Sequence, residues 1–152
     1  IQMNKYLKLI PAIMVMFLLF GCGKKSDIIS SDLVQNLTDN VAFTEQLTEI
    51  SSNNAETRYG LDSKDYIDIM AVIGTAATCD EIVIVKTDDT DNVMELLNQY
   101  LENKQEEYDK YRPDEASKLS NPIIEVHNNT ITMIISGDSQ TAIDAYNEYL
   151  RK

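Results

Sequence analysis

The sequence is poor in the residues that most often carry catalysis, metal binding or cross-linking. Its 152 residues include one histidine, two cysteines and no tryptophan. A catalytic thiol needs a neighbouring base, and no spacing pairs Cys79 with His127, so Cys79 is expected to be a small, half-buried apolar residue. There is no P-loop, no Gly-x-Ser-x-Gly or His-Glu-x-x-His motif, and no cluster of Cys and His. The sequence therefore indicates no catalytic residue, metal ligand or cofactor.

Positive charge is also scarce. The chain has 13 Lys and Arg against 25 Asp and Glu, which gives a formal net charge of −12. Such a charge repels nucleic acid and predicts no nucleic-acid partner, and it is explained more simply by solubility than by a specific cationic ligand. The densest acidic stretch, Asp88-Asp89-Thr90-Asp91, lacks the glycine and distal glutamate of an EF-hand loop. It therefore predicts a helix start instead of a calcium site.

One long apolar run is present, and it lies near the start of the sequence. Lys5 and Lys8 precede positions 9–23, which carry no charge. As a helix this run spans about 22 Å, whereas a bilayer core is about 30 Å thick. A short apolar run behind a basic start is typical of a signal peptide.

The run ends in Leu19-Phe20-Gly21-Cys22, which resembles the bacterial lipobox. The resemblance implies cleavage between Gly21 and Cys22 and a diacylglycerol on the Cys22 thiol, whose two acyl chains suffice for stable anchoring. An uncleaved short anchor is the alternative. We therefore predict three segments: a signal peptide (1–21), a lipidated tether (22–30) and a single domain (31–152). The protein would be anchored to membrane lipid on the extracytoplasmic face of the cell membrane.

The apolar spacing after the tether predicts alternating helices and strands. We expect an amphipathic helix over 31–51 and a strand over 67–77, bent near Gly74. Ile82-Val83-Ile84-Val85 predicts a strand buried on both faces, at the centre of the sheet. A long helix is expected from about 90 to 111, a short one from Pro113, and a last one capped by Asp138-Ser139.

The clearest local pattern is a hairpin around Asn128-Asn129. Two asparagines tolerate the positive φ of a tight turn. Pairing outward from the turn sets apolar residues against apolar ones and polar against polar, with Val126 opposite Ile131. Ile123 then meets Ile134 on the otherwise polar face, so a helix should cover that face locally. His127 falls on the same face beside the turn and is expected to be solvated.

These elements predict an α+β fold in one domain. Their order is α-ββ-αα-ββ-α, with two similar ββα units in tandem. The economical arrangement is a four-stranded, mainly antiparallel sheet packed by helices.

Several segments together resemble a bacterial lipoprotein family described as domain of unknown function 4358. The most specific are Asp80-Glu81-Ile82 at a strand entry and the Tyr-x-Pro-x-Glu element formed by Tyr111, Pro113 and Glu115. The resemblance covers roughly 40–150 and departs from the expected Gly-x-Tyr at the hairpin. It implies a membrane-tethered, secreted domain typical of Gram-positive bacteria, and it brings no catalytic residues.

Three functions are compatible with these features. The first is a non-enzymatic binding or assembly module with an envelope protein partner, for which Tyr108, Tyr111 and Arg112 are the first contact candidates. The alternative for both tyrosines is packing on the helix face. The second is a small extracytoplasmic hydrolase, which would need two carboxylates in one pocket. The third is a lipoprotein that binds a solute or a cation.

Overall fold

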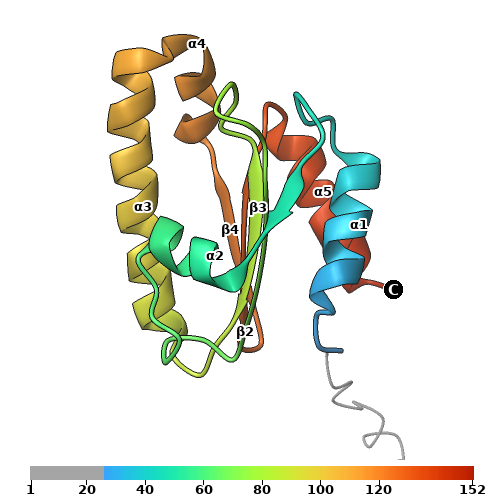
Figure 1. Cartoon of the computed structure of the whole chain (residues 1–152). Coiled ribbons are helices and arrows are strands. Elements are labelled where there is room, and N and C mark those ends of the chain that lie inside the picture. Colours follow the sequence, from blue (N-terminus) through green and yellow to red (C-terminus); the bar gives the residue numbers. More distant parts are fainter. Residues whose placement is uncertain (1–25) are drawn as a thin grey trace, which may run out of the picture.

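The computed structural model describes residues 26–152 and shows one antiparallel sheet between two layers of helices (Figure 1). The helices are α1 (Ser30–Asn40), α2 (Ser52–Tyr59), α3 (Thr90–Tyr111), α4 (Pro113–Ala116) and α5 (Ser139–Leu150), and a 3-10 turn, η1 (Ser117–Ser120), follows α4. The strands are β1 (Thr48–Ile50), β2 (Asp68–Ile73), β3 (Glu81–Lys86), β4 (Ile123–His127) and β5 (Thr130–Ile135). They lie in the order β1-β2-β3-β5-β4. Helices α1 and α5 cover one face, and α2 and α3 cover the other (Figure 1).

Strand β3 is the centre of the sheet, as its run of β-branched residues predicted. Ile82 and Ile84 pack toward α1 and α5, while Val83 and Val85 pack toward α2 and α3. All four side chains are fully buried. The strand therefore joins two apolar clusters, one on each face of the sheet. Within residues 26–152 no helix is long and apolar enough to cross a membrane.

The hairpin prediction is confirmed in register. Val126 pairs with Ile131 and Ile123 with Ile134. Asn128 adopts a φ of 53°, the left-handed conformation for which asparagine at the turn was expected. The second face is covered as well, by α1 together with α5.

His127 is not solvated as expected. Only 8% of its surface is exposed, and its Nε2 lies 3.0 Å from the carbonyl oxygen of Ser26. Ile28, two residues further on, is buried against the α1–α5 face. The segment before α1 therefore covers the polar end of the hairpin, a contact between residues about a hundred positions apart that the local pattern does not reveal.

The prediction of one helix over 31–51 is wrong. Helix α1 ends at Asn40, and Val41 is already extended, with φ −109° and ψ 130°. Beyond it, the Thr44 N–H donates to the Asp80 carboxylate at 2.6 Å, and Thr48–Ile50 pairs with β2. Apolar residues continue at helical spacing after Asn40, which is why a longer helix was predicted. Hydrogen bonds to distant parts of the chain keep the residues after Asn40 extended instead.

The sheet consequently has five strands, not four. Strand β1 is the fifth. Ser51, the last residue of the predicted helix, instead caps the start of α2: its side chain accepts a hydrogen bond from the Asn54 N–H.

The strand predicted over 67–77 is shorter in the structure and covers Asp68–Ile73. Beyond β2 the chain turns at Gly74, where an added Cβ would collide with the Thr78 side chain.

The predicted helix boundaries from Asp88 onward are confirmed. The Asp89 carboxylate caps α3 by accepting from the Asn92 N–H, and Asp138 caps α5 through Thr141. Pro113 occupies the first turn of α4. Gly60 ends α2 in the left-handed conformation that glycine adopts without steric cost. These caps fix α2 and α3 on the same face of the sheet.

Candidate functional site

A buried ionic cluster lies between the central strand and the helices α2 and α3. At its centre is Glu81, the first residue of β3, whose side chain is fully buried. Its Oε2 accepts hydrogen bonds from Arg58 Nη2 at 2.6 Å, Lys104 Nζ at 2.7 Å and the Tyr100 hydroxyl at 2.8 Å. These four residues are called the Glu81 cluster below. Two cations and one carboxylate give it a formal charge of one positive unit.

Helix geometry explains how the cluster assembles. Tyr100 and Lys104 are four positions apart on α3, so they lie on one helix face, and Lys104 donates to the Tyr100 hydroxyl at 2.8 Å. Arg58 comes from the last turn of α2. Its guanidinium carbon lies 5.5 Å from the centre of the Tyr100 ring, and Lys104 Nζ lies 5.2 Å from the same centre. Both cations therefore also contact the aromatic face.

Burial and charge shift the protonation of these groups. Desolvation lowers the pKa of Lys104, although the nearby Glu81 carboxylate opposes that change. Desolvation raises the pKa of Tyr100, and the Glu81 charge raises it further. Within the described part of the chain, the second carboxylate oxygen, Oε1, is buried without a hydrogen-bond partner. An unsatisfied buried acceptor is costly, which makes this an unusual structural ion pair.

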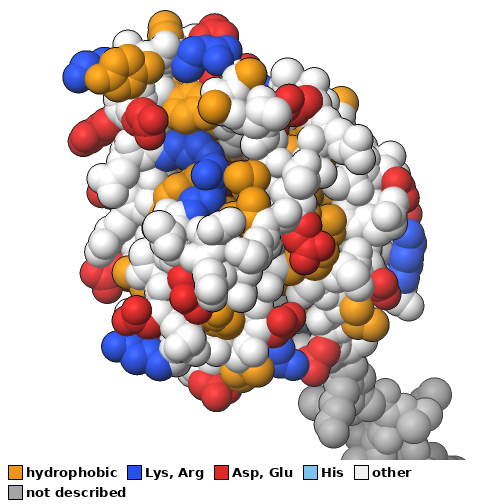
Figure 2. Space-filling model, viewed as in Figure 1, with side chains coloured by type: hydrophobic (Ala, Val, Ile, Leu, Met, Phe, Trp, Pro, Cys, Tyr) orange, Lys and Arg blue, Asp and Glu red, His pale blue; other side chains and the backbone are white. Residues whose placement is uncertain are grey.

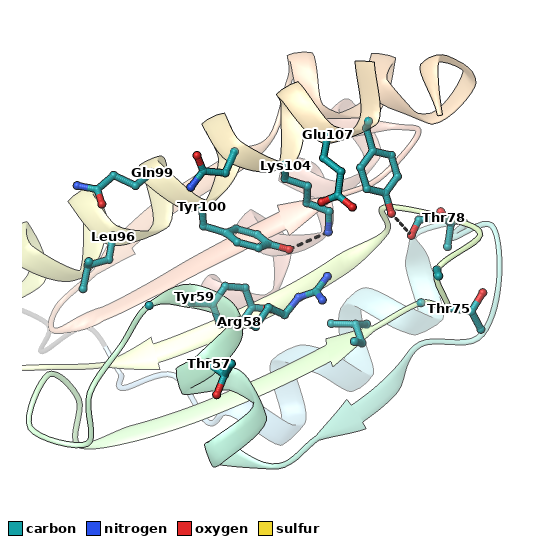
Figure 3. A pocket seen from close by; sticks show the side chains of 16 residues that line it. Thr57, Arg58, Tyr59, Thr75, Thr78, Leu96, Gln99, Tyr100, Lys104 and Glu107 are labelled. Carbon is teal, nitrogen blue, oxygen red and sulfur yellow. Dashed lines mark hydrogen bonds between the residues drawn. The ribbon is translucent and has the colours of Figure 1, made fainter. Parts of the chain in front are cut away.

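Arg58, Tyr100 and Lys104 of the cluster line a cleft of about 590 Å³ between α2, α3 and the turn after β2, and Glu81 lies buried behind them. Arg58 and Lys104 extend into the same space in Figure 3. Figure 2 shows Lys and Arg side chains gathered in a hollow on this side of the molecule. The lining is completed by Thr57, Tyr59, Gly60, Ile73, Gly74, Thr75, Ala76, Thr78, Leu96, Gln99, Asn103, Glu107 and Tyr108. Its size falls within the range of small-molecule sites, about 300 to 1,000 Å³.

A second polar cluster meets the cleft residue Thr78 and joins α4 and η1 to the start of β3. Lys118 donates to Asp80 at 2.9 Å and to Glu115 at 2.8 Å. Glu115 Oε2 also accepts from the Thr78 hydroxyl and from the Cys79 N–H. The two segments that carried the family resemblance, at Asp80-Glu81 and at Glu115, are thus joined directly. This cluster fixes α4 against the entry to β3.

Cys79 belongs to that structural region. Its side chain is fully buried, not half-buried as predicted, and its thiol donates to the Glu115 carbonyl oxygen at 3.4 Å. Burial raises the pKa of the thiol to about 11. His127 pairs with Thr130, which in turn pairs with Lys86 at the far end of β3. Cys79 and His127 therefore lie at opposite ends of the sheet, as expected of residues with no shared chemistry.

The structure separates the three predicted contact residues. Tyr108 lines the cleft and donates its hydroxyl to the Thr78 carbonyl at 3.0 Å. Tyr111 is 67% exposed and lies outside the cleft lining. Arg112 is paired with Asp114 at 3.0 Å on the surface. Gly21 and Cys22, the predicted cleavage and lipidation residues, fall outside the described residues.

Sequence reasoning missed the Glu81 cluster. Glu81 was interpreted only as the residue before a strand. It directly precedes four β-branched residues that were predicted to be buried, and a carboxylate buried beside them needs a positively charged or hydrogen-bonding partner. Lys104 stands four positions after Tyr100, a weaker signal. Nothing local marks Arg58, because its role depends on α2 packing beside α3.

The chain belongs to the family described as domain of unknown function (DUF4358), whose profile matches residues 39–136. This range includes every member of the Glu81 cluster and the whole lining of the cleft. No curated protein and no solved structure matches the chain. The match confirms the resemblance to domain of unknown function 4358 over residues 39–136; it does not test lipid attachment and supplies no activity.

Proposed function

We propose that this protein is a non-enzymatic binding module of the cell envelope that takes a small polar ligand in the cleft above Glu81. The observation that carries the proposal is the convergence of charged and polar groups from α2, α3 and the turn after β2 on one cleft. Arg58, with 30% of its side chain exposed, and the buried Lys104 both line it. A concave site with a few convergent polar groups on rigid elements is the usual form of a ligand site.

Anchoring is the second part of the proposal. Cys22 lies four residues before Ser26, whose carbonyl contacts His127 at the hairpin end of the sheet. Four extended residues reach about 14 Å at most. A lipid on Cys22 would hold that end close to the membrane surface. Glu81 and Lys86 stand at opposite ends of β3, so the cleft would be turned away from the lipid and open to solutes.

The other two functions have weaker support. The centre of the cleft carries two cationic side chains, which disfavours a bound metal cation. A carboxylate hydrolase needs two available carboxylates, whereas Glu81 is engaged by three donor side chains and Glu107 lies exposed at the rim. An envelope protein partner at Tyr111 and Arg112 stays compatible with a ligand site, because these residues lie outside the cleft lining.

A cleft-filling substitution tests the proposal. Ala76 and Ala77 are adjacent and exposed, but only Ala76 lines the cleft. The full chain, extracted from its own membrane, would be examined by native mass spectrometry for a retained small molecule. We expect an adduct on the natural chain and on Ala77→Trp, and its loss from Ala76→Trp, because the indole fills the cleft. An identical mass profile for all three proteins would contradict a ligand site here.

A further inference from the structure

We infer that the ligand of this cleft is a small monoanion, a carboxylate on an apolar or aromatic body; the inference rests on the function proposed above. The first reason is charge. Arg58 and Lys104 share a single carboxylate, Glu81, and only through its Oε2. A ligand with one negative charge would neutralise the remaining positive unit. Charges removed from water are stabilised most when an opposite charge lies beside them.

The second reason is the supply of donors. Glu81 uses Nε and Nη2 of Arg58, so Nη1 takes no part in that ion pair. Lys104 donates to Glu81 and to the Tyr100 hydroxyl, and an ammonium group has three N–H donors. Each cation therefore has a donor beyond those used within the cluster. Two charged donors on one side of a cleft suit the two oxygens of a carboxylate.

The third reason is the shape and chemistry of the walls. The half-buried Tyr100 and Tyr108 present their rings to the cleft, and the buried Tyr59 supports Tyr100 in an edge-to-face contact with ring centres 4.9 Å apart. Leu96 and Ile73 add aliphatic surface. Rings fixed in this way offer apolar area at little entropic cost, which suits a compact hydrophobic body beside the charged group.

The surroundings argue against more highly charged anions. Glu107 stands exposed at the rim, and the chain as a whole carries a formal charge of −12. Figure 2 shows hydrophobic side chains beside the Lys and Arg atoms of the hollow and acidic side chains further out on the same side of the molecule. A dianion would carry one negative charge more than the cluster can neutralise. That extra charge would be repelled by acidic side chains within a Debye length, about 8 Å. The cleft therefore favours one negative charge over two.

Calorimetric titration of the full chain with matched probes tests the inference. The probes are benzoate, its neutral amide benzamide, the cation benzylamine, the aliphatic pair isovalerate and isovaleramide, and inorganic phosphate. We expect at least one carboxylate to bind about tenfold more tightly than its amide, and more tightly than benzylamine or phosphate. A neutral or cationic probe that binds as tightly as its carboxylate, or phosphate binding more tightly than either carboxylate, would overturn the monoanion assignment.

Charge variants separate recognition from folding. Arg58→Gln removes the net positive unit and should weaken carboxylate binding about tenfold, whereas Glu81→Gln adds a unit and should not weaken it. Arg112→Gln removes the same charge as Arg58→Gln, but from the surface, and should bind like the natural chain. Thermal unfolding of each variant confirms that it is folded during the titration. Equal binding by Arg58→Gln and the natural chain would refute the role of the cluster.

The adduct measurement distinguishes the two possible failures. A neutral or cationic adduct that Ala76→Trp abolishes would refute the monoanion and leave the ligand site standing. No carboxylate binding together with no cleft-dependent adduct would refute both proposals. An anionic adduct, lost in Ala76→Trp and reduced in Arg58→Gln, is the result expected from both.

Discussion

At the scale of single residues, the organising feature is one buried carboxylate held by donors from two helices. Glu81 is fully buried, and Lys104 is only 6% exposed. Removing ions from water is expensive, and this arrangement is stable only while each charge keeps its partner. Leaving Oε1 without a partner adds to that expense.

Lys104→Met tests this account. The substitution keeps the length of the side chain but leaves Glu81 with one cation, Arg58. We expect the free energy of unfolding to fall by about 1.5 to 3 kcal/mol, because Glu81 loses one hydrogen bond from a charged donor while Arg58 still balances its charge. Urea unfolding monitored by circular dichroism measures it. Lys110→Met changes an exposed lysine on the same helix and should alter stability by less than about 0.5 kcal/mol.

The combined variant provides the decisive comparison. Glu81→Gln and Lys104→Met each remove one partner of the same ion pair, so the stability lost in the double variant should be smaller than the sum of the two separate losses. A double variant as unstable as the sum of its single changes would show that Glu81 and Lys104 do not interact energetically.

At the scale of elements, the caps place α2 and α3 and thereby build the cleft. Helix α3 supplies Tyr100, Lys104 and Tyr108 from three successive turns of its inner face. Its start is capped by Asp89, three residues after the end of β3. The Asp89 N–H donates to the Thr87 hydroxyl, which in turn donates to the Asp65 carbonyl at 2.6 Å. Helix α2 is bounded by Ser51 and Gly60. Short, well-capped connections of this kind leave the two helices little freedom to move apart.

The cap of α3 gives a prediction at this scale. Asp89→Ala removes the acceptor for the Asn92 N–H and should lower the free energy of unfolding by about 1 kcal/mol. Asp88→Ala, the neighbouring exposed residue, removes the same charge and should have a much smaller effect. Thermal melts of the two variants measure the difference. Equal destabilisation would mean that charge near the helix start matters and the hydrogen bond does not.

At the scale of the whole molecule, the sheet joins two apolar clusters, and its two ends make different contacts. One end contacts the segment leading from the N-terminal side, through Ser26 and His127 and through Asp27 and Lys86. The cleft lies toward the other end, beside Glu81. The contacts of the segment before α1 and the cleft therefore lie toward opposite ends of the sheet.

Replacing Cys22 tests the tether. We expect the natural chain to sediment with membranes and to incorporate labelled palmitate, and Cys22→Ala to do neither, because it lacks the thiol that would take the lipid. Cys79→Ala is the matched control, since it removes the other cysteine, which is buried in the domain. Membrane retention and labelling of Cys22→Ala would reject lipidation at this residue.

The sequence by itself determined the features that depend on neighbouring residues. The central strand followed from a run of β-branched residues, the hairpin register from a period of two around Asn128, and the start of α3 from Asp89. Each was confirmed because backbone preference, side-chain alternation and capping act over a few positions. Lipidation at Cys22 stays a prediction from the same kind of local pattern.

Only the tertiary structure decided where distant segments meet. Strand β1 is three residues long and exists through its pairing with β2. Arg58 and Lys104 each lie 23 positions from Glu81, on opposite sides of it in the sequence. They converge because α2 and α3 pack on the same face of β3, and burial then requires each charge to find a partner. The cleft and its positive centre thus come from packing between elements, which no short stretch of the sequence encodes.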